Sequence, residues 1–129
     1  MVDVLAPISV GELIDKITIL HIKTEKIRDA AAHKNVRNEL DRLLQIRAGL
    51  ELTADLGAVE AQLLDVNRRL WQVEDDLRDL ERLGDFGARF VELARSVYTL
   101  NDRRAALKRQ INEVTSSAII DEKSYHSYQ

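Results

Sequence analysis

The chain has 129 residues, a net charge of −3 and no cysteine. Its length fits one domain, and the missing cysteines exclude disulfides, thiolate metal sites and cysteine nucleophiles. Basic residues form neither an excess nor a stripe, so we expect no nucleic-acid partner. No segment approaches the ~18 consecutive apolar residues of a membrane span, and the amino terminus shows no secretory signal. We therefore expect a cytoplasmic protein without a membrane span.

Long helices are predicted throughout the chain. One proline and five glycines leave few helix breakers, and no stretch alternates with the period of two that marks a strand. We predict an all-α fold, an antiparallel helical bundle of three long helices and one short helix. A single helical domain, residues 1–129, is expected to contain them all.

The first helix is predicted to begin after Ser9, a good N-cap residue that is followed three positions later by Glu12, as in a capping box. Its apolar positions form a wide stripe, which predicts contact with more than one neighbouring helix. We expect this helix to end near Ala32. The second, short helix is predicted to run from a cap at Asn35 to Gly49, a residue type that often terminates helices.

Two heptad seams predict a long coiled-coil-like hairpin of helices at about residues 54–83 and 86–115. Thr53 is the expected cap of the first of these helices. The turn at residues 84–87 is short and has two glycines, so the two helices should be antiparallel neighbours. The seam positions are Leu56, Val59, Leu63, Val66, Leu70, Val73, Leu77 and Leu80, then Phe90, Leu93, Val97, Leu100, Arg104, Leu107, Ile111 and Val114.

The C-terminal tail, residues 116–129, has a different character from the helices. It begins with two serines that interrupt the helical pattern, and it contains two tyrosines and a histidine. Such side chains are unusual in an end that only frays. We expect the tail to dock on the bundle or on a partner chain, and the alternative is a disordered end.

Polar and aromatic side chains are predicted to converge midway along the hairpin. Leu80 placed opposite Phe90 brings the seam arginine near the only tryptophan, a tyrosine and two asparagines. The candidate ligand-binding residues are Asn67, Trp71, Tyr98, Asn101, Arg104 and Lys108. The two cations could hold a carboxylate or phosphate between aromatic walls. The alternatives are a buried polar layer that sets helix register and partner choice, or an arginine that extends outward over apolar surface.

Glu12 and Asp15 form an acidic pair on one face of the first helix, and Asp76 and Asp79 repeat this spacing. Helical nucleotide pyrophosphohydrolases bind magnesium through acidic pairs of this kind, because Mg²⁺ prefers carboxylate oxygens. The capping position of Glu12 and the charged surroundings of the second pair offer a structural explanation instead. No two histidines have metal-ligand spacing on one helix. We expect no bound metal and no cofactor.

Several blocks of the sequence resemble a family of short, uncharacterised bacterial proteins, a domain-of-unknown-function family. The first block is PISVGELIDKITIL at residues 7–20, and others lie at residues 66–75, 93–109 and 122–125. The resemblance covers nearly the whole chain. It implies a bacterial origin and a cytosolic, all-helical protein, and it brings no established activity from which catalytic residues could be transferred.

We predict a non-enzymatic helical protein that self-associates and acts as an adaptor or scaffold. The reason is that the seams and the wide apolar stripe of the first helix exceed what one hairpin can cover. A homo-oligomer is expected, with a dimer favoured, and another protein partner is possible. One alternative is a binding protein or enzyme for an anionic metabolite, with a polar site between the hairpin helices. The second alternative is a Mg²⁺-dependent nucleotide hydrolase.

Overall fold

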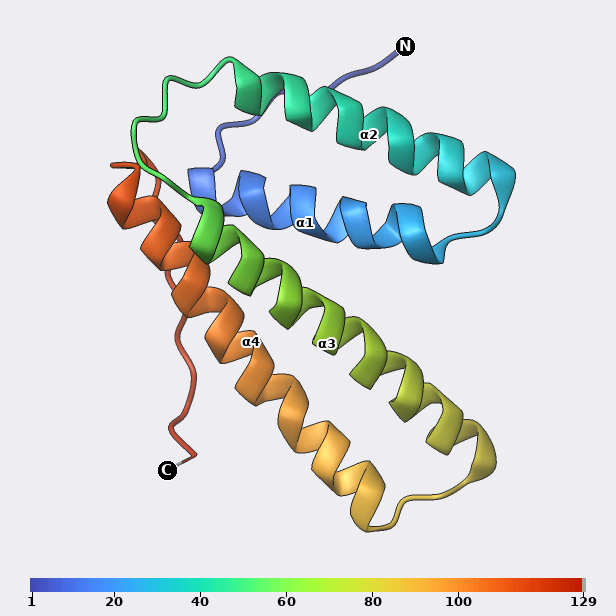
Figure 1. Ribbon diagram of the computed structural model, residues 1–129. Helices are drawn as coiled ribbons and strands as arrows, with labels where there is room; N and C mark the ends of the chain where they lie inside the picture. The colour runs from blue at the N-terminus through green and yellow to red at the C-terminus, as the bar shows by residue number, and fades with distance from the viewer. Residues whose placement is uncertain (129) are drawn as a thin grey trace.

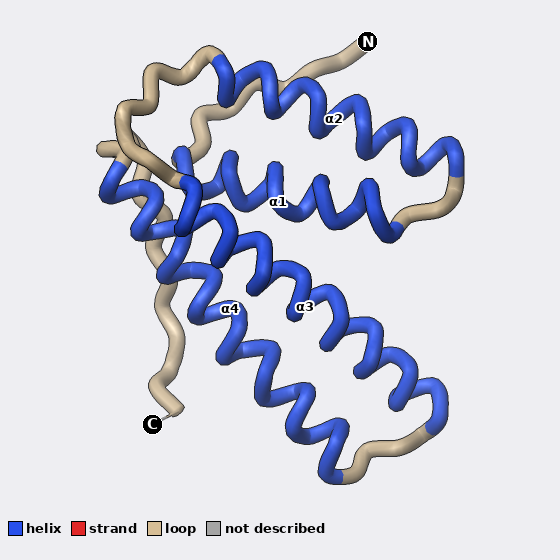
Figure 2. The backbone as a smooth tube through the Cα atoms, viewed as in Figure 1, coloured by secondary structure: helices blue, strands red, loops and turns tan. Residues whose placement is uncertain are grey.

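A computed structural model describes residues 1–128, and all the regular structure in that range is helical (Figures 1 and 2). The predicted all-α bundle is therefore confirmed. The helices are α1 (Val10–Lys26), α2 (Ala30–Ala48), α3 (Gly57–Leu83) and α4 (Ala88–Val114). They form two hairpins, α1 with α2 and α3 with α4, which meet near their open ends and diverge toward their turns (Figure 1).

The boundary between α1 and α2 differs from the prediction. Ser9 does cap α1, because its hydroxyl accepts the Glu12 N–H at 3.0 Å. The helix ends at Lys26, well before Ala32, and α2 is a 19-residue helix that starts earlier than predicted. The physical reason is a second cap, since the Asp29 side chain accepts the backbone N–H of Ala32 at 2.9 Å.

The α3–α4 hairpin matches the predicted ranges to within a few residues. Gly84 ends α3 in the left-handed region at φ 68°, where glycine is favoured. Thr53 does not cap α3, because the helix begins later and Asp55 accepts the N–H of Gly57 instead. Seam burial falls along the hairpin: Leu63 is fully buried, whereas Leu77, far from α1, is half-buried.

Helix α1 lies at the centre of the packing and contacts all three other helices. Helix α2 packs on α1, and it contacts α3 through an ion pair between Arg47 and Glu60. One apolar face of α1, around Ile14, packs with the α3 and α4 seams near Leu63 and Ile111. A second face, around Ile17, packs on Leu40 of α2. The wide stripe of the first helix is thus explained by two separate apolar clusters on one helix.

The C-terminal tail runs back along α4 (Figure 1). Ser117 accepts the N–H of Val10 at 3.1 Å, and the Lys123 ammonium lies 3.0 Å from Asp102 of α4. In this structure, residues of the tail therefore contact the bundle itself. Gln129, which the predicted tail also included, lies outside the described residues.

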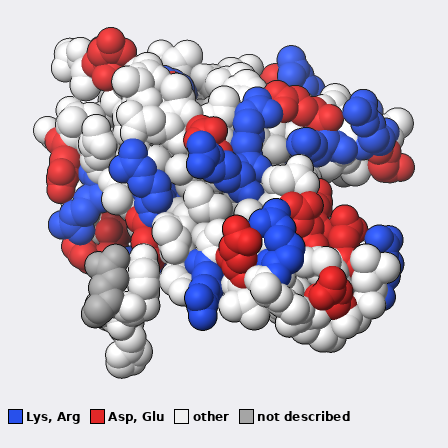
Figure 3. Space-filling model, turned by 60° about the horizontal axis from the view of Figure 1, so that its bottom comes forward, with Lys and Arg blue, Asp and Glu red and all other residues white. Residues whose placement is uncertain are grey.

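Acidic and basic side chains are mixed on the face shown in Figure 3, and the outline is notched at the right edge, between the two hairpins. No helix within residues 1–128 combines the length and the apolar character that crossing a membrane requires.

Candidate functional site

A polar cluster lies where α1, α3 and α4 meet, and its members are Glu12, Asp15, Thr18, Asn67, Arg104 and Lys108. Asp15 is at its centre, with none of its surface exposed. One carboxylate oxygen accepts the Asn67 amide and the Arg104 Nε–H, each at 2.9 Å, and the other accepts an Arg104 Nη2–H at 2.5 Å. The pair is bidentate, the strongest geometry for an arginine and a carboxylate.

Glu12, the second acidic residue of the cluster, is also paired with a cation. The Lys108 ammonium lies 2.5 Å from Glu12 and 3.9 Å from Asp15. Two carboxylates therefore face two cations, and the charges within the cluster balance. Within residues 1–128, no group of three or more His, Cys, Asp or Glu residues could hold a metal. Glu12 and Asp15 instead pair with Lys108 and Arg104 across the contact between α1 and α4.

The electrostatics of Arg104 reflect this arrangement. The hydrogen bond to Asp15 raises the pKa of the guanidinium above its usual value, burial opposes that effect, and the charges of Asp15 and Glu12 add to it. The guanidinium stays charged at any physiological pH. A buried charge without its partner is costly, so the pair fixes which face of α4 meets α1.

The first turn of α1 is held by contacts that the sequence analysis missed. The Gly11 N–H donates to the Asn112 side chain at 2.6 Å. The Ser9 hydroxyl donates to Asp121 of the tail at 2.5 Å. A Cβ at position 11 would lie 2.5 Å from the Lys108 carbonyl oxygen, so only glycine permits this approach of α1 to α4. A glycine in the first turn of a well-capped helix was the available signal.

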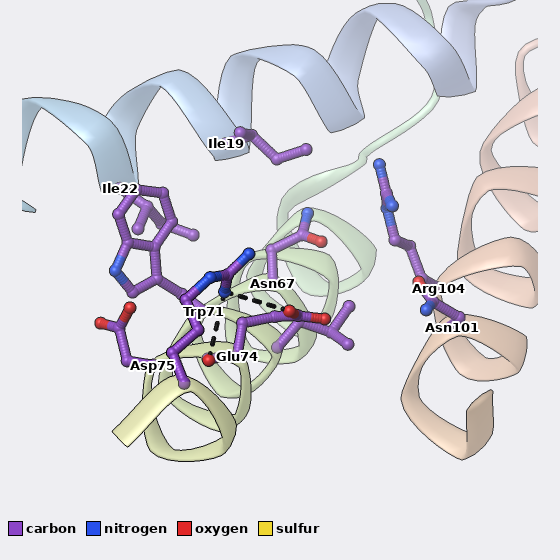
Figure 4. A pocket seen from close by; sticks show the side chains of 10 residues that line it. Ile19, Ile22, Asn67, Trp71, Glu74, Asp75, Asn101 and Arg104 are labelled. Atoms are coloured by element: carbon purple, nitrogen blue, oxygen red, sulfur yellow. Dashed lines mark hydrogen bonds and ion pairs between the residues drawn. The ribbon is translucent and has the colours of Figure 1, made fainter. Parts of the chain in front are cut away.

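A cleft opens on the outer side of the polar cluster, and we call it the Trp71 cleft (Figure 4). Its volume is about 480 Å³. Its walls come from three helices: two isoleucines of α1, the α3 side chains around Trp71, and Asn101 with Arg104 from α4 (Figure 4). The lining residues are Ile19, Ile22, Asn67, Leu70, Trp71, Glu74, Asp75, Arg78, Asn101 and Arg104.

Four of the six candidate residues therefore line one cleft, and two lie elsewhere. Lys108 is paired with Glu12 inside the polar cluster. Tyr98 faces the tail, with its ring centroid 4.8 Å from that of Tyr128. Tyr98 and Arg104 are six positions apart, and at about 100° per residue this places the two side chains roughly 120° apart around α4. The register estimate fixed position along the hairpin and ignored rotation about the helix axis.

Several polar groups of the cleft keep free hydrogen-bonding capacity. A guanidinium has five N–H donors, of which Asp15 takes two. Within residues 1–128, no hydrogen bond engages the Asn101 amide or the Trp71 indole N–H. Arg78 is paired with Glu74 at the rim, which leaves Asp75 as the one unmatched charge among the lining residues.

A model described as a family of unknown function (DUF6165) matches residues 4–128. The resemblance seen in the sequence is thereby confirmed over nearly the whole chain. No curated protein and no solved structure is found to match it. Inference about function therefore depends on the geometry of the chain itself.

Proposed function

We propose that this chain, which belongs to the family of unknown function DUF6165, binds a small organic carboxylate in the Trp71 cleft. The observation that carries the proposal is the convergence of a tryptophan, two asparagines and an arginine with free donors on one open cleft. Apolar walls with a few polar groups are the usual composition of a small-molecule site. The lining supplies hydrogen-bond donors and apolar walls, and we propose binding as the function of the cleft.

The charge of the cleft narrows the ligand class. Asp15 neutralises Arg104, and Glu74 neutralises Arg78, so the lining holds no excess of positive charge. A polyanion such as a nucleoside triphosphate would be repelled by the unpaired carboxylate of Asp75 and would gain little binding free energy from the neutralised cations. A single carboxylate can still accept from Arg104 and Asn101, and an attached ring or alkyl group can cover Trp71 and the isoleucines.

Trp71 reports on the cleft directly, because it is the only tryptophan of the chain. We expect aromatic and branched aliphatic monocarboxylates to change Trp71 fluorescence saturably and to raise the melting temperature. Inorganic phosphate and nucleoside triphosphates should do neither. Absence of a saturable change with every carboxylate tested at millimolar concentration would contradict the proposal.

Asn101→Ala is the informative variant, since Asn101 lines the cleft and is outside the Asp15–Arg104 pair. Removing one hydrogen bond to a charged ligand should weaken binding about tenfold while leaving the fold intact. Asn38→Ala is the matched control, because Asn38 is exposed on α2, away from the cleft. Equal affinities of the two variants would remove Asn101 from the site.

Self-association is a second proposed function, and an apolar groove between residues 4–10 and α2 supports it. This N-terminal groove has a volume of about 650 Å³, and Leu5 and Ile46 are 88% and 52% exposed beside it. Lys16 and Glu39 also line it, so a two-fold related copy could pair each lysine with the glutamate of the other chain. A bacterial, cytoplasmic homodimer acting as an adaptor or scaffold is the corresponding proposal.

Light scattering coupled to size-exclusion chromatography tests the N-terminal groove as a dimer interface. We expect the wild-type chain to be a dimer and Ile46→Asp to be a monomer, because a buried unpaired charge at the contact disfavours association. Leu83→Asp is the control, since Leu83 is 72% exposed at the far turn of the α3–α4 hairpin. A wild-type monomer at every concentration would refute self-association and leave the Trp71 cleft unaffected.

A further inference from the structure

All three tyrosines of the chain line one cavity between α4 and the tail. Its volume is about 360 Å³, and we call it the tyrosine cage. Its members are Tyr98, Tyr125 and Tyr128, with Val97, Asn101, Asp102, Lys123 and His126. Tyr98 and Tyr128 have their ring centroids 4.8 Å apart and their planes tilted by 56°, so the two rings form adjoining walls.

One ring of the cage, that of Tyr125, already contacts a cation of the chain itself. The Lys123 ammonium lies 5.1 Å from the centroid of Tyr125, within the ~6 Å range of a cation–π contact. The same nitrogen lies 3.0 Å from a carboxylate oxygen of Asp102, whose side chain is only 21% exposed. An aromatic surface beside a partly buried carboxylate is an environment that stabilises an ammonium ion.

We propose that the tyrosine cage is a binding site for a methylated ammonium group, with Lys123 as its internal competitor. A quaternary ammonium is recognised by several aromatic faces at once, which a single tethered lysine does not exploit. Asp102 supplies the opposite charge. An unmethylated amine would make the same cation–π contact and ion pair that Lys123 already makes. It would also compete against a tethered group whose effective concentration is in the millimolar range or above.

The site is separate from the Trp71 cleft, although Asn101 lines both. Neither Asp102, Lys123 nor any tyrosine lines the Trp71 cleft. Substitutions at those positions therefore test the tyrosine cage without touching the proposed carboxylate site, and either proposal can fail without the other.

Titration with tetramethylammonium chloride, followed by the ring resonances of the three tyrosines in nuclear magnetic resonance spectra, tests the proposal. We expect saturable shifts of Tyr98 and Tyr128 in the wild-type chain, and none with sodium chloride at equal ionic strength. Lys123→Gln removes the competitor and should tighten binding about tenfold. Lys34→Gln on α2, an exposed position, is the matched control and should bind as the wild type does.

Asp102→Asn keeps the shape of the side chain and removes its charge, so it should weaken tetramethylammonium binding about tenfold or more. This variant tests the site separately from Lys123→Gln, which could also loosen the contact between the tail and α4. Choline and phosphatidylcholine vesicles, titrated in parallel, distinguish a free ligand from a lipid headgroup, and binding of either supports a methylammonium site. Identical behaviour of tetramethylammonium and sodium in both the wild type and Lys123→Gln would overturn the proposal.

Discussion

Replacing Asp15 with alanine is expected to lower the free energy of unfolding by about 3–5 kcal/mol. Asp15 is fully buried, and its carboxylate accepts three hydrogen bonds from Asn67 and Arg104. The substitution leaves the guanidinium, which is 30% exposed, without its counter-charge at a three-helix contact. Urea denaturation followed by circular dichroism would measure the change.

The double substitution Asp15→Leu with Arg104→Met distinguishes the net contribution of the ion pair from the cost of leaving one of its charges unpaired. Apolar replacement of both partners removes the desolvation cost of the two charges together with their attraction, so most of the lost stability should return. Full recovery is not expected, because the buried Asn67 amide loses the hydrogen bond that it donates to Asp15. Asp65→Ala is the surface control, because Asp65 is 58% exposed and pairs with Arg69 on the same helix. It should change stability little. An Asp15→Ala protein as stable as the control would show that the polar cluster does not hold α1 in place.

Replacing Gly11 with alanine is expected to cost about 2–3 kcal/mol of unfolding free energy. In an unobstructed helix the same change would gain up to about 1 kcal/mol from helix propensity. Here the new Cβ would lie 2.5 Å from the Lys108 carbonyl oxygen and 2.9 Å from the Asn112 side chain. The obstruction is mainly backbone, so α1 would have to move away from α4 and stretch the hydrogen bond that Gly11 donates to Asn112.

Gly49→Ala is the matched control for Gly11. A Cβ at Gly49 would meet only carbonyl oxygens of its own helix, at 3.5 and 3.7 Å, which is ordinary contact. We expect a change within about 1 kcal/mol, measured by the same urea denaturation. A Gly11→Ala protein that unfolds at the same denaturant concentration as Gly49→Ala would contradict the close approach of α1 and α4.

The sequence predicted the hairpin well because its signals are local. Leucine and valine at alternating spacings of three and four define a face of a helix, and the glycines at 84 and 87 define the turn, without reference to the rest of the chain. The start of α2 was harder, because Asp29 and Asn35 are both acceptable caps. The choice between them depends on how α1 ends and on where α2 packs.

The site was predicted only in part, because its main partner comes from another hairpin. Arg104 was placed correctly near Asn67 and Asn101, since these residues share the hairpin. The acid that pairs with Arg104 lies 89 residues away on α1, and no short-range pattern connects the two. Glu12 and Asp15 of α1 were instead considered as metal ligands, a use that the neighbouring cations oppose.

The contacts that hold the first turn of α1 have a consequence for protein synthesis. Gly11 and Ser9 bind residues 101 and 112 positions further along the chain. A ribosome must therefore release almost all of this chain before the beginning of α1 can be secured, whereas α3 and α4 meet through a short turn as soon as both have emerged. The α3–α4 hairpin can therefore pair before the first turn of α1 makes its contacts with Asn112 and Asp121.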